Sequence, residues 1–299
     1  MPLLKVEADK LTIEDRQRGV IEEIIDNDEL FALLPFAQTM DETYSYVREK
    51  TLAGGAWFDP YEDLEESASE FDPVAVKLKR LAGQVDIDNF MSEVSSNLND
   101  QVAIQLAMKA KGMGRQFRND LVNGDSSVNA KQMDGLFKFV TPGQTLGTGN
   151  GAAVSFTALD ELKDAVKLGA DVLMMRQGTW RAIRALNRSM GGNTADHIML
   201  QNFGRPIPAY DGIPVIINDF LPANETQGTN NETCSIYALR LNEVDGFHGV
   251  FGGPAAGFRV ENVGLLQGKD ATRWRMKWYV CTALKATHAI ARLRGVTNI

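Results

Sequence analysis

The 299-residue sequence has few of the residue types on which most catalytic and metal sites depend. It contains three histidines and two cysteines. None of the histidines, His197, His248 and His288, stands in an H-E-x-x-H pattern or beside a cysteine at zinc spacing. No serine lies in a G-x-S-x-G motif. We therefore expect no metal ion, no cofactor and no catalytic residue, and we predict that the protein is not an enzyme.

The sequence also lacks long apolar segments. No stretch approaches the roughly 20 apolar residues that span a bilayer, and the first residues, MPLLKVEADK, lack the apolar core of a signal peptide. This pattern predicts a cytoplasmic product with no membrane partner. In a reducing compartment Cys234 and Cys281 are expected to be free thiols, although their separation along the chain leaves a single disulfide open.

One glycine-rich run has two interpretations. Residues Gly147, Gly149 and Gly151 alternate with polar residues ahead of a predicted helix, as in some nucleotide-binding loops. The full G-x-G-x-x-G and G-x-x-x-x-G-K-[ST] patterns are absent, and Pro142 and Gly143 separate the run from the preceding strand candidate. A flexible connection is the favoured reading, and an α/β nucleotide-binding enzyme is the alternative.

Charge is distributed unevenly along the chain. Residues 1–72 carry six basic and nineteen acidic side chains, whereas residues 269–299 carry seven basic and one acidic. One interpretation is that each charged run is simply a surface exposed to solvent. The sharper hypothesis is that copies of the chain attract one another through complementary ends.

The first third of the sequence has the pattern of a projecting hairpin. Residues 43–50 have strand composition, and residues 74–88 alternate apolar with polar residues. Between them lies a segment rich in glycine and proline, with seven acids from Asp59 to Asp72 and no lysine or arginine. Four of these acids have no basic residue close by in the sequence, and we predict that they contact neighbouring subunits: Glu62, Asp63, Glu65 and Glu66.

A long helix is expected next, from about residue 89 to about residue 122. Apolar residues recur every four positions from Phe90 to Leu106, and the stripe continues at Met113, Phe117 and Leu121. Gly112 and Gly114 interrupt it. They are either a hinge within one helix or a linker between two helices.

The rest of the chain mixes strands and helices. Arg273, Arg275 and Lys277 are expected on one face of a strand, opposite Trp274 and the other apolar residues, and all four tryptophans are expected in the core. The elements expected are a helix at 12–26, an extended arm at 30–39, a strand at 135–140, a helix at 157–168, a strand at 170–175, a helix at 178–190, and strands at 212–219, 234–241, 257–264 and 270–293.

This order of parts resembles the major capsid protein of tailed bacteriophages, the Hong Kong phage capsid fold that encapsulin shells share. The motifs are similar to those of the family in sequence and order: TALDELKDAVKLGADVLMMRQGTWRAIRAL at 157–186, GRPIPAYDGIPVIINDFLP at 204–222 and RWRMKWYVCTALKATHAIARLRGV at 273–296. Each motif is weak alone, but their agreement in order and spacing over most of the chain is specific.

The resemblance implies an α+β fold divided into an N-terminal arm (1–40), a hairpin called the E-loop (41–87), a peripheral domain with a spine helix (88–140), an inserted axial domain (141–262) and a return to the peripheral domain (263–299). It implies a shell protein of the virion, assembled in the host cytoplasm as hexamers and pentamers around double-stranded DNA that is bound without sequence specificity. A separate scaffolding protein is expected, because the arm starts near Met1. A portal and decoration proteins are further implied partners, and an encapsulin nanocompartment is the nearest alternative.

Overall fold

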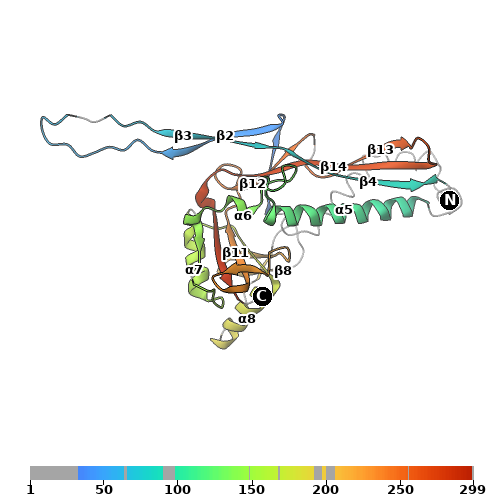
Figure 1. Ribbon diagram of the computed structural model, residues 1–299. Helices are drawn as coiled ribbons and strands as arrows, with labels where there is room; N and C mark the ends of the chain where they lie inside the picture. The colour runs from blue at the N-terminus through green and yellow to red at the C-terminus, as the bar shows by residue number, and fades with distance from the viewer. Residues whose placement is uncertain are drawn as a thin grey trace.

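The computed structural model describes residues 33–63, 66–89, 98–147, 149–167, 169–191, 197–199, 206–254 and 256–297. These residues form a five-stranded sheet, an eight-stranded sheet and a two-stranded hairpin, and the hairpin projects from the rest of the molecule (Figure 1). The mixture of helices and sheets confirms the α+β class. The predicted helix at 12–26, most of the arm and the start of the long helix lie outside the described residues.

The five-stranded sheet is organised around β14, the longest strand of the described part. The first ten residues of β14 pair antiparallel with β4 along one edge, and the other edge pairs first with β13 and then with β12. The end of the predicted arm forms β1, which pairs parallel with β12. The strands are β1 (Phe36–Thr39), β4 (Lys79–Asp88), β12 (Phe247–Gly252), β13 (Arg259–Leu265) and β14 (Ala271–Leu284).

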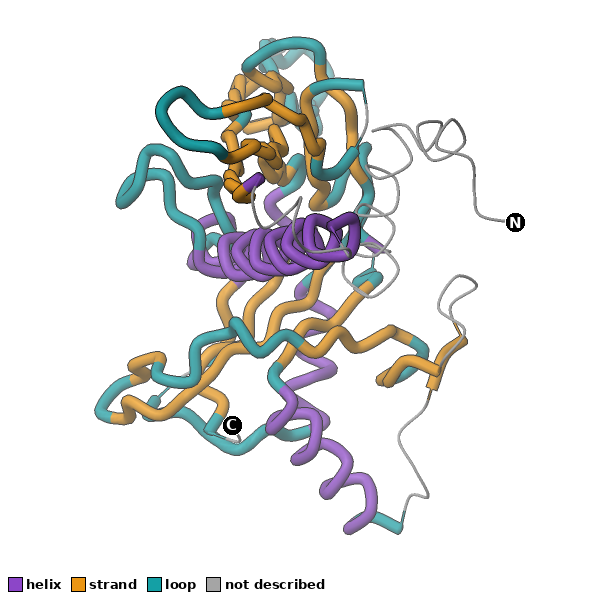
Figure 2. The backbone as a smooth tube through the Cα atoms, turned by 90° about the vertical axis from the view of Figure 1, so that its right-hand side faces the viewer, coloured by secondary structure: helices purple, strands orange, loops and turns teal. Residues whose placement is uncertain are grey.

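Helix α5 (Leu98–Asn123) runs along this sheet (Figure 1), and the view turned by 90° shows strands on both sides of it (Figure 2). Its apolar stripe is buried where it faces the strands, and the Phe117 ring lies 4.8 Å from the ring of Trp278. The helix ends at the predicted stop, where Gly124 donates its N–H to the carbonyl of Asp120. Because the helix passes through residues 112 to 114 without a break, the prediction of two helices joined by a glycine linker is wrong.

The segment predicted as a strand at 135–140 is instead a single helical turn, α6 (Leu136–Phe139). Leu136 is fully buried in the same cluster as α5, while Phe137 points outward. This run of large apolar residues therefore does not lie on a sheet. An apolar run this short fits either element, and here tertiary packing selected the helix.

The eight-stranded sheet has the order β5-β15-β11-β6-β9-β8-β7, with β10 paired to β11. Helices α7 (Phe156–Ala165) and α8 (Gln177–Ser189) contribute Leu159, Leu162, Trp180 and Ile183 to the core on one face of it. The opposite face joins the core beneath α5. The strands are β5 (Thr145–Leu146), β6 (Val172–Met175), β7 (His197–Met199), β8 (Pro206–Tyr210), β9 (Ile213–Ile217), β10 (Glu225–Gln227), β11 (Asn230–Leu239) and β15 (Ile290–Val296).

Two predicted strands are each divided between two sheets. The segment 74–88 turns at Leu78, so that its first half pairs with the hairpin and its second half becomes β4. The segment 270–293 turns through a short 3-10 helix, η2 (Thr287–Ala289), and separates into β14 and β15. Periodicity indicates which side chains face inward, but it does not show which sheet a strand joins.

The sheet topology also bears on the predicted domain segments. β12 comes from the segment expected to be axial, yet it pairs in the five-stranded sheet. β15 comes from the segment expected to return to the peripheral domain, yet it lies in the eight-stranded sheet. The chain therefore crosses between the two sheets more often than the predicted boundaries imply, and the boundaries themselves stay a prediction.

Candidate assembly surfaces

The projecting hairpin consists of β2 (Thr43–Thr51) and β3 (Glu70–Lys77), paired antiparallel and joined by an 18-residue loop, residues 52–69 (Figure 1). Large apolar side chains of the hairpin are exposed. The relative exposures of Trp57 and Tyr61 are 102% and 107%, so no part of the chain that the structure describes buries these rings. The expectation that all four tryptophans are in the core is wrong for Trp57. An exposed aromatic pair on a projecting element is typical of a binding surface.

Three of the four predicted contact acids lie on the described part of the same loop. Glu62 accepts a hydrogen bond from the backbone N–H of Asp59, and Asp63 and Glu66 are exposed. Glu65 lies outside the described residues. Lower in the hairpin, Glu70 is paired across the strands with Lys50 at 2.8 Å. The tip of the hairpin therefore combines exposed aromatic rings with carboxylates, while its stem contains a local ion pair.

Side chains rather than a continued backbone ladder attach the hairpin to the five-stranded sheet. The Tyr46 hydroxyl donates to the carbonyl of Leu284 at 2.7 Å, and the Arg48 guanidinium donates to the carbonyls of Leu284 and Lys285 at 2.7 and 2.8 Å. Burial raises the pKa of the Tyr46 phenol. These bonds set the direction in which the hairpin leaves the sheet.

A buried histidine lies beneath this attachment. The imidazole of His248 packs edge-on against the Tyr44 ring at 5.7 Å, and its Nε2 atom is buried without a hydrogen-bond partner. Burial lowers the pKa of His248. The remaining histidines are placed elsewhere: His197 lies on β7, and His288 is exposed beside Gln144.

The basic face predicted on β14 is present. Trp274, Met276 and Trp278 are buried, while Arg273, Arg275 and Lys277 share the other face. Two of these three cations are already neutralised within the chain. Arg273 binds Asp86 through two hydrogen bonds of 2.6 and 2.7 Å, and Lys277 pairs with Glu261 at 2.5 Å. This face is therefore less able to attract an acidic segment than its sequence suggests.

Arg292, another cation of the basic tail, is buried inside the subunit. Its guanidinium pairs with the Glu225 carboxylate at 2.9 Å and donates to the Ser235 hydroxyl at 2.9 Å. Its central carbon lies 4.8 Å from the Phe137 ring centre and 5.8 Å from that of Tyr237. No sequence pattern indicates this pair, because its members lie 67 residues apart on β10 and β15.

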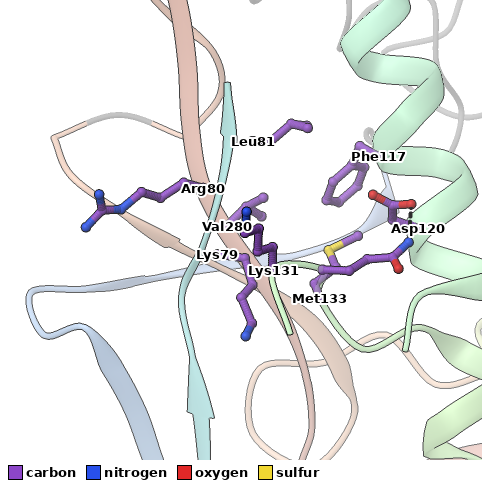
Figure 3. Close-up of a pocket in the computed structure, with 9 residues that line it drawn as sticks. Lys79, Arg80, Leu81, Phe117, Asp120, Lys131, Met133 and Val280 are labelled. Carbon is purple, nitrogen blue, oxygen red and sulfur yellow. Dashed lines mark hydrogen bonds between the residues drawn. The ribbon is translucent and has the colours of Figure 1, made fainter. Parts of the chain in front are cut away.

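A small hollow with an apolar floor and a charged rim opens between β4 and the C-terminal end of α5 (Figure 3). Phe117, Met133 and Val280, each at most 5% exposed, lie at its base. The charged residues around it are three cations and one acid: Lys79, Arg80, Lys131 and Asp120. The Lys79 ammonium donates to the carbonyl of Ala130 at 2.6 Å. Apolar surface beside cationic groups is chemically complementary to the aromatic and acidic tip of the hairpin.

The glycine run at 147–151 has a structural explanation. Gly147, Gly149 and Gly151 all have positive φ. A Cβ atom on Gly147 would lie 2.4 Å from the carbonyl oxygen of Arg294, so the loop packs directly against the end of β15. Helix α7 begins later, at a cap in which Ser155 accepts from the N–H of Ala158. The glycines therefore fit close backbone packing, and the loop does not lead straight into a helix N-terminus as a phosphate loop does.

The residues that the structure describes contain no group of three His, Cys, Asp or Glu side chains placed to hold a metal ion. Cys234 and Cys281 are both free thiols and both buried, and burial raises the pKa of Cys281 to about 12. Among the helices of the described segments, none is long and apolar enough to cross a membrane.

Comparison with known proteins identifies the class defined by this architecture. The model of the phage capsid family matches residues 10–238. The type 2A encapsulin shell protein of Mycobacterium leprae (strain TN) is 27% identical over 244 residues, which cover 80% of this chain and 72% of that protein.

Two solved structures have the same fold. The holo-SrpI encapsulin complex from Synechococcus elongatus PCC 7942 has a TM-score of 0.72 at 22% identity and covers 99% of this chain and 96% of its own. The capsid of a native GTA particle has a TM-score of 0.65 at 16% identity, with 89% of each chain covered. The chain thus has the Hong Kong phage capsid fold and is a capsid shell protein. It belongs to the phage capsid family.

Proposed function

We propose that this chain is the major capsid protein of a tailed phage, and that copies of it assemble as hexamers and pentamers into an icosahedral virion shell around double-stranded DNA. The observation that carries the proposal is the projecting hairpin, whose Trp57 and Tyr61 rings are fully exposed in the single subunit. An isolated two-stranded hairpin is marginal in water. A neighbouring copy supplies the surface that this element lacks.

Burying these aromatic rings against a neighbouring copy would contribute a large free energy for the area involved. A buried aromatic side chain removes about 150–250 Å² from water, which is worth roughly 4 to 6 kcal/mol at about 25 cal/mol per Å² before ordering entropy is subtracted. Repetition on every subunit of a closed shell multiplies this term. The hollow beside Phe117 is our candidate for the receiving surface, since Arg80 and Lys131 at its rim complement Glu62 and Asp63.

The charge of the hairpin tip provides the first test. The variant is Glu62→Lys, Asp63→Lys, Glu65→Lys and Glu66→Lys, and its matched control reverses four exposed acids elsewhere: Glu161, Asp164, Glu232 and Glu243. Both variants change the net charge by the same amount. We expect the hairpin variant to fold but to assemble poorly at low salt, while the control assembles like the parent. Assembly of the hairpin variant at the parental rate, measured by light scattering, would show that the tip charge is unimportant.

An encapsulin nanocompartment is a second candidate function. It is supported by the 27% identity to the Mycobacterium leprae shell protein and by the higher TM-score of the encapsulin structure. The two functions differ in what the shell encloses. Particles purified from the native source should contain nuclease-protected DNA if this is a phage capsid, and a protein cargo without DNA if it is an encapsulin. Electron microscopy of the same particles tests whether a shell forms at all.

A further inference from the structure

The outer face of α8 carries charge of one sign. Residues 172–195 contain four arginines, no lysine and no acidic residue, in a chain whose net charge is −8. Arg176, at the start of α8, is engaged with the carbonyls of Asp219 and Leu221. Arg181, Arg184 and Arg188 are exposed. We call these three residues the α8 stripe.

The three guanidinium groups of the α8 stripe have no counter-charge in the described part of the subunit. None of its ion pairs involves them. Like charges three and four positions apart on a helix destabilise it, and ordinary surface helices offset them with acids at the same spacing. α8 has no such acids, so a counter-charge is expected from outside the subunit.

The geometry of the stripe suits an extended polyanion. At about 100° per residue the three positions fall within an arc of about 60°, and at about 1.5 Å per residue they span about 10 Å along the helix. One strand of a DNA duplex has a phosphate about every 3.4 Å along the helix axis, so this span covers about three phosphate steps. The planar guanidinium group binds phosphate oxygens through two parallel hydrogen bonds.

The composition of this face favours nucleic acid over a protein partner. Its exposed positions include Gln177 and Ala185, and the one large apolar side chain nearby, Met190, follows the end of the helix. A protein interface normally has a buried apolar or aromatic centre, which this face lacks. Figure 1 places α8 at the end of the eight-stranded sheet region, far from the projecting hairpin. The stripe is therefore separate from the hairpin surface described above.

We propose that the α8 stripe binds the phosphate backbone of nucleic acid without reading its sequence. The inference rests on the proposed function, since it names which residues of the shell contact the enclosed DNA. Each subunit contributes few contacts, so binding is weak per subunit and gains strength from repetition along one DNA molecule.

The test uses the full-length chain and two variants that each remove three positive charges. The stripe variant is Arg181→Gln, Arg184→Gln and Arg188→Gln, because glutamine retains good helix propensity. The matched control replaces three exposed cations outside α8 by glutamine: Lys111, Arg115 and Lys167. The probe is a fluorescein-labelled 30-base-pair DNA duplex of arbitrary sequence. Its anisotropy is measured at several salt concentrations, and a second duplex of different sequence checks sequence independence.

We expect the stripe variant to bind the duplex at least tenfold more weakly at low salt. The slope of log affinity against log salt should become shallower by about 2 to 3, since each phosphate contact contributes about 0.9. The control should bind like the parent. Equal behaviour of the two variants, or parental binding by the stripe variant, would overturn the inference. So would stripe-dependent binding of a polyglutamate peptide without DNA binding, which would identify an acidic protein as the partner.

Light scattering on the same samples separates this inference from the proposed function. A stripe variant that forms particles normally, and whose unassembled subunits no longer bind the duplex, would support both. A parent chain that binds DNA through the stripe and never forms particles, with or without a scaffolding protein, would refute the proposed function and leave the stripe as a DNA-binding surface.

Discussion

Trp57 at the hairpin tip is fully exposed, whereas Trp180 on α8 and Trp274 and Trp278 on β14 lie in the packed cores and are at most 9% exposed. The same residue type therefore has two uses in one chain. In the sheets it fills a core that stabilises the subunit, and Trp278 contacts Phe36, Phe117 and Phe258 through ring centres 4.8 to 5.8 Å apart. On the hairpin the exposed ring adds no packing that stabilises the single subunit. The comparison teaches that folding and assembly depend on different parts of this chain, and substitutions can separate them.

The strongest test of the comparison pairs two aromatic deletions. Phe117→Ala removes a ring that is 1% exposed beneath β14, and we expect a loss of about 3 to 5 kcal/mol in the free energy of unfolding. Trp57→Ala should change the same quantity by less than about 0.5 kcal/mol, because its ring is exposed, yet it should impair assembly. Urea unfolding and light scattering measure the two effects. If Trp57→Ala destabilised the subunit as much as Phe117→Ala, the separation of folding residues from assembly residues would be wrong.

The next test compares a buried ion pair with an exposed one. Arg292→Met leaves the Glu225 carboxylate buried without its cation, and removing one partner of such a pair costs about 3 to 5 kcal/mol. The double variant with Glu225→Leu should recover much of this loss. Lys50→Met, which removes a cation from the exposed pair with Glu70 in the hairpin, should cost about 0 to 1 kcal/mol. Urea unfolding measures the loss of stability in each variant. If Arg292→Met and Lys50→Met lowered the free energy of unfolding equally, this ranking would be wrong.

The root of the hairpin, where the two regions meet, should respond to pH through His248. Burial holds the pKa of His248 below its ordinary 6.5, so near and below that pH the unfolded chain binds more protons than the folded one. The contribution of His248 is therefore fully present above pH 6.5 and decreases as the pH falls toward the folded pKa, by at most about 1.4 kcal/mol per pH unit. The nearby charges are Lys285, which opposes protonation, and Glu243, which favours it; Tyr44 and Cys281 also pack in this region.

Hydrogen exchange checks this pH dependence locally. Amides of β2 should exchange faster at pH 5.5 than at pH 7.5 after correction for intrinsic rates, and His248→Phe should remove the difference. His288→Gln, which changes an exposed histidine, is the control and should retain it. A pH response that persists in His248→Phe would assign it to another group.

Much of the local structure was predictable because local patterns determine it. Strand composition predicted β2, alternation predicted the two faces of β14, and the four-residue stripe predicted α5 with an end near residue 122. The Asp211-Gly212 pair, both with positive φ, forms the turn between β8 and β9. In each case, residues adjacent in the sequence contain the information.

The features that could not be predicted depend on distant partners. Trp57 lies in the segment that was predicted to project, and the expectation that it is a core residue overlooked this context. Nothing local divides the segment 270–293 between two sheets. The burial of Arg292 depends on Glu225 and Ser235 from other strands. Of the predicted contact acids, Glu62, Asp63 and Glu66 do lie on the projecting loop, but their role in contacts between subunits stays a prediction. The α8 stripe was overlooked, although its signal was present in the sequence as a 24-residue stretch without an acid.

The smallest expected effect concerns the hinge predicted at Gly112 and Gly114, which lies in the helix that supports the five-stranded sheet. Gly112 is exposed, and a Cβ atom added there would meet no heavy atom within 4 Å, so Gly112→Ala should stabilise α5 by about 0.5 to 1 kcal/mol. Gly114 is buried, so alanine at that position tests packing as well as helix propensity.

Under the hinge hypothesis, the Gly112→Ala, Gly114→Ala double variant builds precursor shells of parental size that resist expansion, because the most flexible point of the helix has been removed. Ala103→Gly is the matched control, since it introduces a glycine at another exposed position of α5. It should leave shell expansion unchanged and should lower the stability of the helix by about as much as Gly112→Ala raises it. Particle diameter by electron microscopy, before and after an expansion trigger, gives the answer. Normal expansion of Gly112→Ala and of the double variant would show that α5 moves as a rigid rod and that its glycines are not a hinge.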